Sequence, residues 1–292
     1  MIFRGSAVAL ITPFFEDGTV DFESLGKLIQ YHLQNKTDAI VAIGTTGEAI
    51  TMTEEERLAV IKFCVEKINH KIPLIAGVGN NDTGESADFA KKASALNPDA
   101  ILVITPYYNK CNQEGLYRHF KTIAEASTVP VILYTVPSRT TVEIQPQTLK
   151  RLAEIKNIVG IKDATGNLGY TAKIKNILPD DFAIYCGNDD VTVPMLSMGA
   201  DGVISVCANI LPNETHEMCQ AFFDGDIEKS RQMQLKYLDM INSLFAQTNP
   251  IPVKAAINLM GMNGGYYRLP LCEPSDETME LLKKNMKNLG LI

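Results

Sequence analysis

The feature that most restricts the fold of this chain is a repeated alternation of short apolar segments with longer amphipathic ones. Eight segments rich in β-branched residues recur at spacings of roughly 20 to 35 residues, which is typical of strands and helices that alternate in a parallel sheet. The segments begin at Ala7, Ala39, Pro73, Ala100, Pro130, Ile158, Phe182 and Gly202. Eight such units predict an α/β protein with a closed (β/α)8 barrel, or TIM barrel, and disfavour an open doubly wound sheet.

The helical patterns between and after these segments define the domain organisation. Residues 22–35 and 54–68 carry apolar side chains at helical spacing, with charges on the opposite face. After Val206 the strand-like segments stop, and helical patterns cover 227–247, 252–261 and 278–290. We therefore expect residues 1–224 to form the barrel with the active site, and residues 225–292 to form a small all-helical C-terminal region packed on it.

Composition excludes several classes of function. A chain of 292 residues, 46% of them hydrophobic, can bury a large core, and its net charge of −7 argues against nucleic acid or a membrane surface as a partner. No apolar segment approaches the roughly 20 residues that span a bilayer. The first apolar run is followed by Pro13 without a small-residue cleavage site, so we expect a strand there and not a signal peptide. Six cysteines without a C-x-x-C pair indicate a reducing cytoplasm.

Polar residues that close the strand segments are the candidates for chemistry, because the active site of such a barrel lies at the C-terminal ends of its strands. Their side chains are hydroxyls, amides, acids and two cationic groups, which suits a carbonyl substrate that bears a carboxylate. They are Thr45, Thr46 and Glu48; Tyr107, Tyr108 and Asn109; Tyr134 and Arg139; Lys162 and Asp163; and the GNDD segment that begins at Gly187.

Lys162 is the most informative of these residues, since it closes the apolar segment IVGIKD. Burying an ammonium is costly, because the loss of water disfavours the charged form. A neutral amine on a rigid strand end can attack a ketone and form a Schiff base. The alternative is a lysine that caps the barrel and extends to water. Nearby threonine and tyrosine hydroxyls, which can transfer the protons that imine chemistry requires, favour the catalytic interpretation.

The other polar residues have structural alternatives. Tyr108 and Tyr134 could cap the barrel through hydrogen-bonded hydroxyls, and Arg139 could form a solvated salt bridge. GVGNND at Gly77 lacks the third glycine of a dinucleotide-binding fingerprint and is interpreted as a strand-to-helix turn. Asp189 and Asp190 could bind a cation, but acids at a barrel rim are more often helix caps. Neither a metal nor a cofactor is predicted.

Five motifs carry a resemblance to a known family. GTTGEA, TPYYNK, LYTVPSRT, GIKDATGN and NPIPVK occur in this order and cover nearly the whole chain, which resembles the dihydrodipicolinate synthase family within the pyruvate-dependent class I aldolases. GTTGE and the lysine strand also occur in N-acetylneuraminate lyase, whereas the arginine of VPSRT is specific to the synthases. The resemblance implies a lyase that condenses pyruvate with L-aspartate 4-semialdehyde to 4-hydroxy-tetrahydrodipicolinate, in the diaminopimelate and lysine pathway.

The resemblance also assigns roles to individual residues. It implies that Lys162 forms the Schiff base and that the proton relay is made by Tyr134, Thr45 and Tyr108, with Tyr108 reaching in from a neighbouring subunit. The remaining substrate contacts are Thr46 to the pyruvate carboxylate, Arg139 to the carboxylate of the semialdehyde, and the backbone of Gly187 and Ile204. A homotetramer built as a dimer of dimers is implied as well.

This chain departs from the family at the residues that match a regulatory site for lysine. Some members are inhibited by lysine at a dimer interface, and the matching positions here are Ala49, Asn81, Glu85 and Tyr107. Glu54 and Arg57 stand where inhibited members often carry histidines, so we expect weak or absent inhibition. Two alternatives to the synthase remain at this point: a sister aldolase that cleaves N-acetylneuraminate or a 2-keto-3-deoxy sugar acid, and a non-catalytic sensor of a 2-oxo acid.

Overall fold

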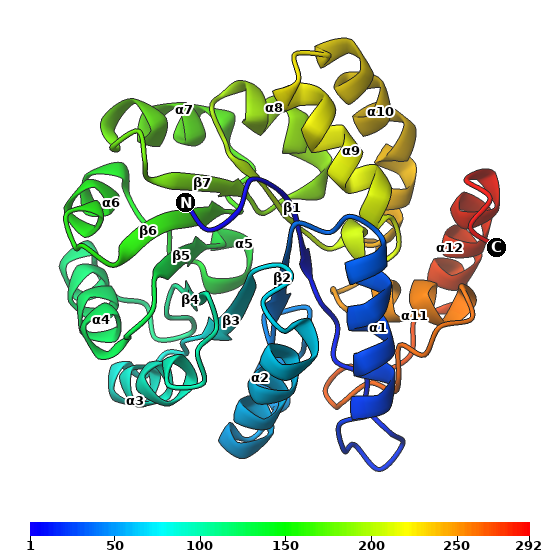
Figure 1. Cartoon of the computed structure of the whole chain (residues 1–292), viewed down its shortest axis with the longest axis horizontal. Coiled ribbons are helices and arrows are strands. Elements are labelled where there is room, and N and C mark those ends of the chain that lie inside the picture. Colours follow the sequence, from blue (N-terminus) through cyan, green and yellow to red (C-terminus); the bar gives the residue numbers. More distant parts are fainter.

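Eight parallel strands close into a barrel in the computed structural model, which describes residues 1–292 (Figure 1). Each strand pairs with the next along the chain, and β1 pairs with β8, so the predicted (β/α)8 fold is confirmed. The strands are β1 Gly5–Ala9, β2 Ala39–Ala42, β3 Leu74–Val78, β4 Ala100–Ile104, β5 Val131–Thr135, β6 Ile158–Asp163, β7 Ala183–Cys186 and β8 Gly202–Ser205.

Helices surround the barrel because the segments between strands are amphipathic and begin with side chains that accept hydrogen bonds from free backbone N–H groups. Thr53 forms a full capping box with Glu56 at the start of α2, and Asp21, Asp82 and Asn112 cap α1, α3 and α4. The helices are α1 Phe22–Gln34, α2 Glu54–Ile68, α3 Thr83–Ser94, α4 Gln113–Ala126, α5 Pro137–Thr140, α6 Pro146–Ala153, α7 Leu168–Ile177, α8 Thr192–Ser197 and α9 Pro212–Phe223.

The barrel interior is closed at the N-terminal ends of the strands. The ring of Tyr185 stacks on Phe3 with centroids 4.2 Å apart, and the Tyr185 hydroxyl donates to the Phe3 carbonyl at 3.0 Å. Phe3 and Tyr185 belong to a compact cluster in the barrel interior, together with small and branched side chains such as Ala7 and Ile75. A larger core fills the space between strands and helices. The barrel is therefore filled at its base, and space for a ligand remains only toward the C-terminal ends of the strands.

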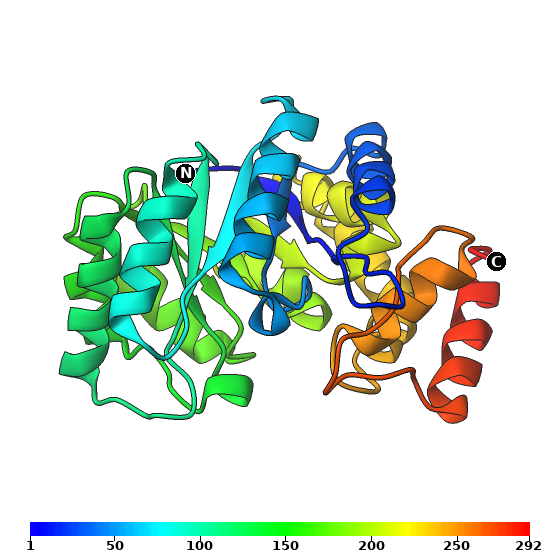
Figure 2. The same cartoon turned by 90° about the horizontal axis from the view of Figure 1, so that it is seen from below.

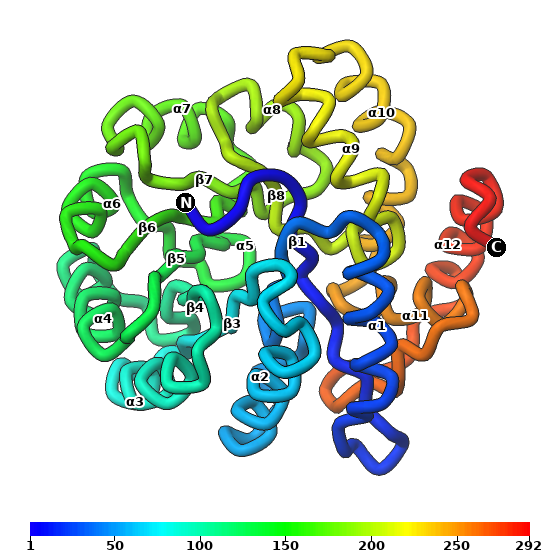
Figure 3. The backbone as a smooth tube through the Cα atoms, viewed as in Figure 1, coloured from blue at the N-terminus to red at the C-terminus, as the bar shows by residue number.

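The C-terminal helices lie on one side of the barrel, as the gold, orange and red segments of Figures 2 and 3 show. They are α10 Ile227–Ser243, α11 Ile251–Leu259 and α12 Asp276–Asn288. Buried residues from them, including Leu244 and Met286, belong to the same core cluster as the barrel helices. None of the helices is both long and apolar enough to cross a bilayer. The division of the chain near residue 225 remains a proposal.

Several element boundaries differ by a few residues from the predicted ones, and one predicted cap differs in its partner. The first strand begins at Gly5, before the predicted Ala7, because Gly5 and Ser6 pair with β8. Leu10 and Ile11 stay buried beyond its end and pack in the core without being part of the strand. No side chain of the GNDD segment caps the short 3-10 helix Asp189–Val191 that it begins. The Asp189 carboxylate instead accepts the backbone N–H groups of Val206 and Cys207, at 2.9 and 3.2 Å, at the start of the 3-10 helix Cys207–Asn209.

Candidate active site

A cavity of about 740 Å³ opens at the C-terminal ends of the strands. Because the ends of parallel strands meet at one rim, residues that are far apart in sequence reach this single space. Of the residues to which the resemblance assigns a role in the site, all but Ile204 and Glu85 line it. The other strand-end candidates, Glu48, Asn109, Asp163, Asp189 and Asp190, do not. The lining includes Thr45, Thr46, Ala49, Asn81, Tyr107, Tyr108, Tyr134, Arg139, Lys162 and Gly187.

Lys162 lies in this cavity with its side chain almost entirely enclosed, the residue being 7% exposed. Its ammonium nitrogen is 4.4 Å from the ring centre of Tyr134, which is the residue opposite Lys162 in the β5–β6 register. No acidic side chain forms an ion pair with Lys162, and no hydrogen bond holds its amine. The amine is thus held on a rigid strand end and is available for bond formation.

Gly187, the residue after β7, provides the room for this lysine. A Cβ atom at Gly187 would lie 3.1 Å from the Lys162 Cε and 2.7 Å from the Ala164 Cβ. The Gly187 N–H donates to the Asp163 carbonyl at 2.8 Å, which fixes the end of β7 beside the end of β6. Any side chain at position 187 would therefore displace Lys162 or the strand end that carries it.

Three hydroxyl-bearing residues with a predicted role in proton transfer line the cavity. Tyr134 on β5 is buried, and Thr45 lies in the turn after β2. Tyr108, after β4, is 92% exposed and has a backbone φ of 64°, in the left-handed region that a bulky residue rarely adopts. Within one chain, Tyr108 therefore reaches the mouth of the cavity without any packing that accounts for its strained backbone.

Two groups suited to carboxylates, Thr46 and Arg139, also line the cavity, and Asn249 from the C-terminal region contacts both. The Asn249 amide donates to the Thr46 hydroxyl at 3.0 Å, and the Asn249 backbone carbonyl accepts from the Arg139 guanidinium at 3.1 Å. Asn249 is 5% exposed and its Oδ1 has no partner. No residue pattern in the sequence singles out Asn249 as a site residue, although the NPIPVK motif begins with it.

Two buried acids hold the strand ends that frame the cavity. Asp163 accepts from the Thr165 backbone at 2.9 Å and from the Thr171 hydroxyl at 2.8 Å, which shapes the turn after β6. Asp189 ties the turn after β7 to the end of β8, and burial raises the pKa of its carboxyl group. Ile204, by contrast, is fully buried within the barrel interior on β8. No group of three or more His, Cys, Asp or Glu side chains could hold a metal ion.

A second cavity, of about 330 Å³, lies between the N-terminal part of α2 and one face of α3. Glu85 is part of its lining, together with Glu54, Arg57 and Lys92. The Lys92 amine pairs with the Glu54 carboxylate at 2.5 Å, and the Arg57 guanidinium stacks 4.2 Å over the Phe89 ring. The predicted regulatory residues are therefore divided, with Ala49, Asn81 and Tyr107 in the first cavity and Glu85 in the second.

The fold and the cavity together define a class of protein: a barrel lyase with a lysine nucleophile that can form a Schiff base with a carbonyl compound. The model of the dihydrodipicolinate synthetase family matches residues 2–289. The chain belongs to this family. The family, the fold and the enzyme class predicted from the resemblance are thereby confirmed.

Individual relatives agree over the full length. The chain is 53% identical to the 4-hydroxy-tetrahydrodipicolinate synthase of Clostridium perfringens over 291 residues, which cover 100% of both chains. Among solved structures, the dihydrodipicolinate synthase of Aquifex aeolicus superposes with a TM-score of 0.97 at 45% identity and covers 99% of each chain. The chloride-inhibited enzyme of Acinetobacter baumannii, complexed with pyruvate, gives a TM-score of 0.97 at 45% identity over 100% of each chain.

Proposed function

We infer that this chain condenses pyruvate with L-aspartate 4-semialdehyde to give 4-hydroxy-tetrahydrodipicolinate, the reaction of the synthases to which it is similar, in lysine biosynthesis. The observation that carries this inference is Lys162, an enclosed amine without an ion-pair partner at the end of β6. It lies in a cavity whose lining holds both hydroxyls and an arginine.

The reaction begins with attack of the Lys162 amine on the ketone of pyruvate, and loss of water gives a protonated imine. The positive nitrogen withdraws electrons from the adjacent carbon, so that loss of a methyl proton forms an enamine. The enamine carbon attacks the aldehyde of the second substrate. The amine of that substrate then displaces Lys162 and closes the ring. We assign the proton transfers of these steps to Tyr134, Thr45 and Tyr108.

The remaining assignments concern substrate position. Thr46 binds the carboxylate of pyruvate. Its hydroxyl oxygen accepts a hydrogen bond from the Asn249 amide, which leaves the hydroxyl proton free to be donated to a carboxylate oxygen. Arg139 binds the carboxylate of the semialdehyde, for which the guanidinium fork provides two donors. Gly187 and Ile204 contribute backbone groups to the lining. The exposed Arg139 and the deeper Thr46 would thus separate the two substrates along the cavity.

We also propose that the enzyme is a homotetramer, a dimer of dimers, in which Tyr108 enters the site of a second copy. Its support is the combination of a left-handed backbone and 92% exposure at Tyr108, since such strain persists only where surrounding contacts compensate for it. A reducing cytoplasm is the proposed location, supported by the buried free thiols of Cys64, Cys186, Cys207 and Cys219.

Borohydride reduction tests the role of Lys162. We expect pyruvate and borohydride to add one pyruvate-derived group to the chain, located on Lys162 by peptide mass spectrometry, and to abolish turnover. Lys162→Ala removes both the adduct and the activity, whereas Lys173→Ala on the exposed face of α7 is a control that retains them. Wild-type turnover by Lys162→Ala would contradict the assignment. An adduct without product from the semialdehyde would indicate a sister aldolase.

A further inference from the structure

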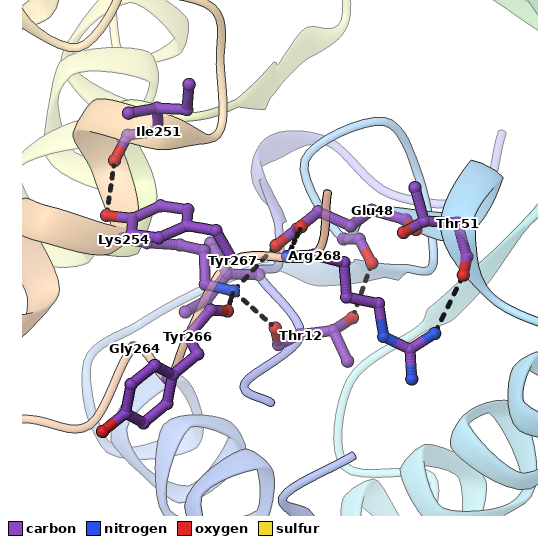
Figure 4. Close-up of polar contacts among 12 residues, drawn as sticks. Thr12, Glu48, Thr51, Ile251, Lys254, Gly264, Tyr266, Tyr267 and Arg268 are labelled. Atoms are coloured by element: carbon purple, nitrogen blue, oxygen red, sulfur yellow. Dashed lines mark hydrogen bonds and ion pairs between the residues drawn. The ribbon is translucent and has the colours of Figure 1, made fainter. Parts of the chain in front are cut away.

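A buried ion pair next to the active site is not used by the reaction described above. Glu48 and Lys254 are 2% and 0% exposed, and the Lys254 Nζ lies 2.7 Å from the Glu48 Oε1 (Figure 4). The two residues are 206 positions apart, one in the turn after β2 and the other on α11. The pair therefore joins the barrel directly to the C-terminal region.

Every proton of the Lys254 ammonium has an acceptor. Besides Glu48, it donates to the Thr12 carbonyl at 3.2 Å and to the Tyr266 carbonyl. The second carboxylate oxygen of Glu48 accepts the backbone N–H of Arg268 at 3.3 Å. These carbonyls fix the direction of the ion pair as well as its length, so the pair has one geometry in the fold.

Two glycines allow the C-terminal segment to come this close. A Cβ atom at Gly264 would lie 2.7 Å from the Lys254 carbonyl oxygen, and one at Gly265 would lie 2.4 Å from the Phe14 backbone nitrogen. Arg268, further along the same segment, donates to the Thr51 carbonyl at 2.9 Å and pairs with the Glu56 carboxylate at 2.5 Å. The segment thus contacts both ends of the stretch 48–56.

The turn that the ion pair holds is the one that carries the site hydroxyls. The Glu48 N–H donates to the Thr45 carbonyl at 3.1 Å, and Thr46 lies between them. Glu48 itself has a φ of 55°, a left-handed conformation that the turn requires. On the other side of the turn, the Thr12 hydroxyl donates to the Gly47 carbonyl at 2.8 Å. A shift of Glu48 would therefore move the hydroxyls of Thr45 and Thr46.

We propose that the Glu48–Lys254 ion pair is a positioning device that fixes the Thr45–Thr46 turn for the carboxylate of pyruvate. Stability alone does not explain the pair, because a buried ion pair is often no more stabilising than apolar side chains of similar volume. Directionality does explain it, since the backbone carbonyls of Thr12 and Tyr266 place the ammonium and the ammonium places Glu48. Glu48 and Lys254 are thus positioning residues, which act through Thr46 and do not touch the substrate.

This inference rests on the proposed function, and one experiment separates the two. We would measure the pyruvate concentration that half-saturates borohydride trapping of Lys162, together with KM, kcat and Tm. We expect Glu48→Gln, which keeps the shape but removes the charge, to raise both the half-saturating concentration and the KM for pyruvate about tenfold, as for the loss of one charge-assisted hydrogen bond. The KM for the semialdehyde should change less than about twofold, within the scatter of a remote change.

A double variant and a control distinguish positioning from a general loss of stability. Lys254→Met alone leaves a buried carboxylate unpaired and lowers Tm, while Glu48→Gln combined with Lys254→Met recovers Tm but not the KM for pyruvate. Asp38→Asn breaks a partly buried contact with His216 at the closed end of the barrel, where Asp38 Oδ2 lies 2.9 Å from His216 Nδ1. This control lowers Tm and leaves the KM for pyruvate unchanged.

Three results would overturn the positioning role, and they differ in what they imply for the proposed function. If Glu48→Gln or the double variant is trapped at the wild-type pyruvate concentration, the positioning role is wrong while the proposed function stands. If the KM for both substrates rises equally in Glu48→Gln and in Asp38→Asn, the pair serves stability only and the inference is overturned. If the wild-type chain itself is not trapped by pyruvate, the proposed function fails and the inference fails with it.

Discussion

At the scale of single residues, two buried lysines have opposite surroundings. The Lys254 ammonium is paired with the Glu48 carboxylate and two backbone carbonyls, and burial lowers the pKa of this lysine while Glu48 raises it. Lys162 has no acidic partner and lies beside a tyrosine ring and a glycine. One lysine therefore has a compensated charge and a fixed direction, and the other keeps a free amine. We therefore propose a structural role for Lys254 and a chemical role for Lys162, two lysines that differ only in their neighbours.

A buried histidine makes stability depend on pH. His32 on α1 is 1% exposed, and burial lowers its pKa to about 3. Because the unfolded chain binds a proton at this site below about pH 6.5 and the folded chain does so only near pH 3, the unfolded state holds more protons between these values. The contribution of His32 is thus fully present above pH 6.5 and is lost as the pH falls toward 3. We expect the free energy of unfolding in urea to decrease over this range.

Variants isolate this effect from that of other groups. His32→Gln removes the titrating ring, so the free energy of unfolding should depend less steeply on pH between 6.5 and 3 than in the wild type. His70→Asn changes an exposed histidine after α2 and serves as the control that keeps the wild-type slope. Equal slopes for all three proteins would show that His32 is not held neutral by the fold.

Sequence reasoning located the site residues that follow strands but missed those that reach the site from elsewhere. Lys162, Tyr134 and Thr45 could be grouped because the barrel topology brings strand ends together. Asn249 contacts Thr46 across 203 positions, and no local period or spacing predicts such a contact. Its position depends on how α11 docks on the barrel, which is a property of tertiary packing.

At the scale of elements, helices with strong capping signals were predicted most accurately. The predicted range 54–68 coincides with α2, where Thr53 and Glu56 form a capping box. The short helix α5, Pro137–Thr140, was not predicted, since four residues are too few to show a helical period. The turns of the barrel rim were therefore the least predictable elements, although they carry Arg139.

The cavity between α2 and α3 bears on regulation by lysine. We propose that free lysine inhibits this enzyme weakly or not at all. The cavity between these helices contains Arg57 and Lys92, and Lys92 already pairs with Glu54. Glu85 lines this cavity as well, but the other positions of the family's lysine site, Ala49, Asn81 and Tyr107, line the first cavity, so no single cavity of one chain gathers the groups that would hold a lysine. We expect turnover to fall by less than about twofold at 1 mM lysine. Half-occupancy at this concentration requires a binding free energy of only about 4 kcal/mol, so even a weak site would be detected.

A paired substitution provides the matching test. Inhibited relatives often carry histidines at the positions of Glu54 and Arg57, so Glu54→His with Arg57→His should increase inhibition by lysine. Initial rates with both substrates saturating, measured at several lysine concentrations, compare the two proteins. Clear suppression of the wild-type rate at millimolar lysine would refute the proposal.

At the scale of the whole molecule, we expect the barrel not to fold without the C-terminal region. A chain that ends at Asp224 would leave Glu48 buried without its cation and would expose core positions that Leu244 and Met286 cover. Such a chain should show no cooperative thermal transition by near-ultraviolet circular dichroism. A chain that lacks only Leu291 and Ile292 is the control and should melt cooperatively. A cooperative transition of 1–224 would establish the barrel as an independent folding unit.

The ion pair between residues 48 and 254 also has a consequence for the timing of biosynthesis. The ribosome makes the chain from its N-terminus, so all eight strands emerge before Lys254 does. During that interval the turn with Thr45 and Thr46 has no cation to hold it, even if the strands have already paired. If the ion pair positions this turn as proposed, the pocket for pyruvate is completed only after Lys254 has left the ribosome, and we expect a translation product interrupted before it to be inactive.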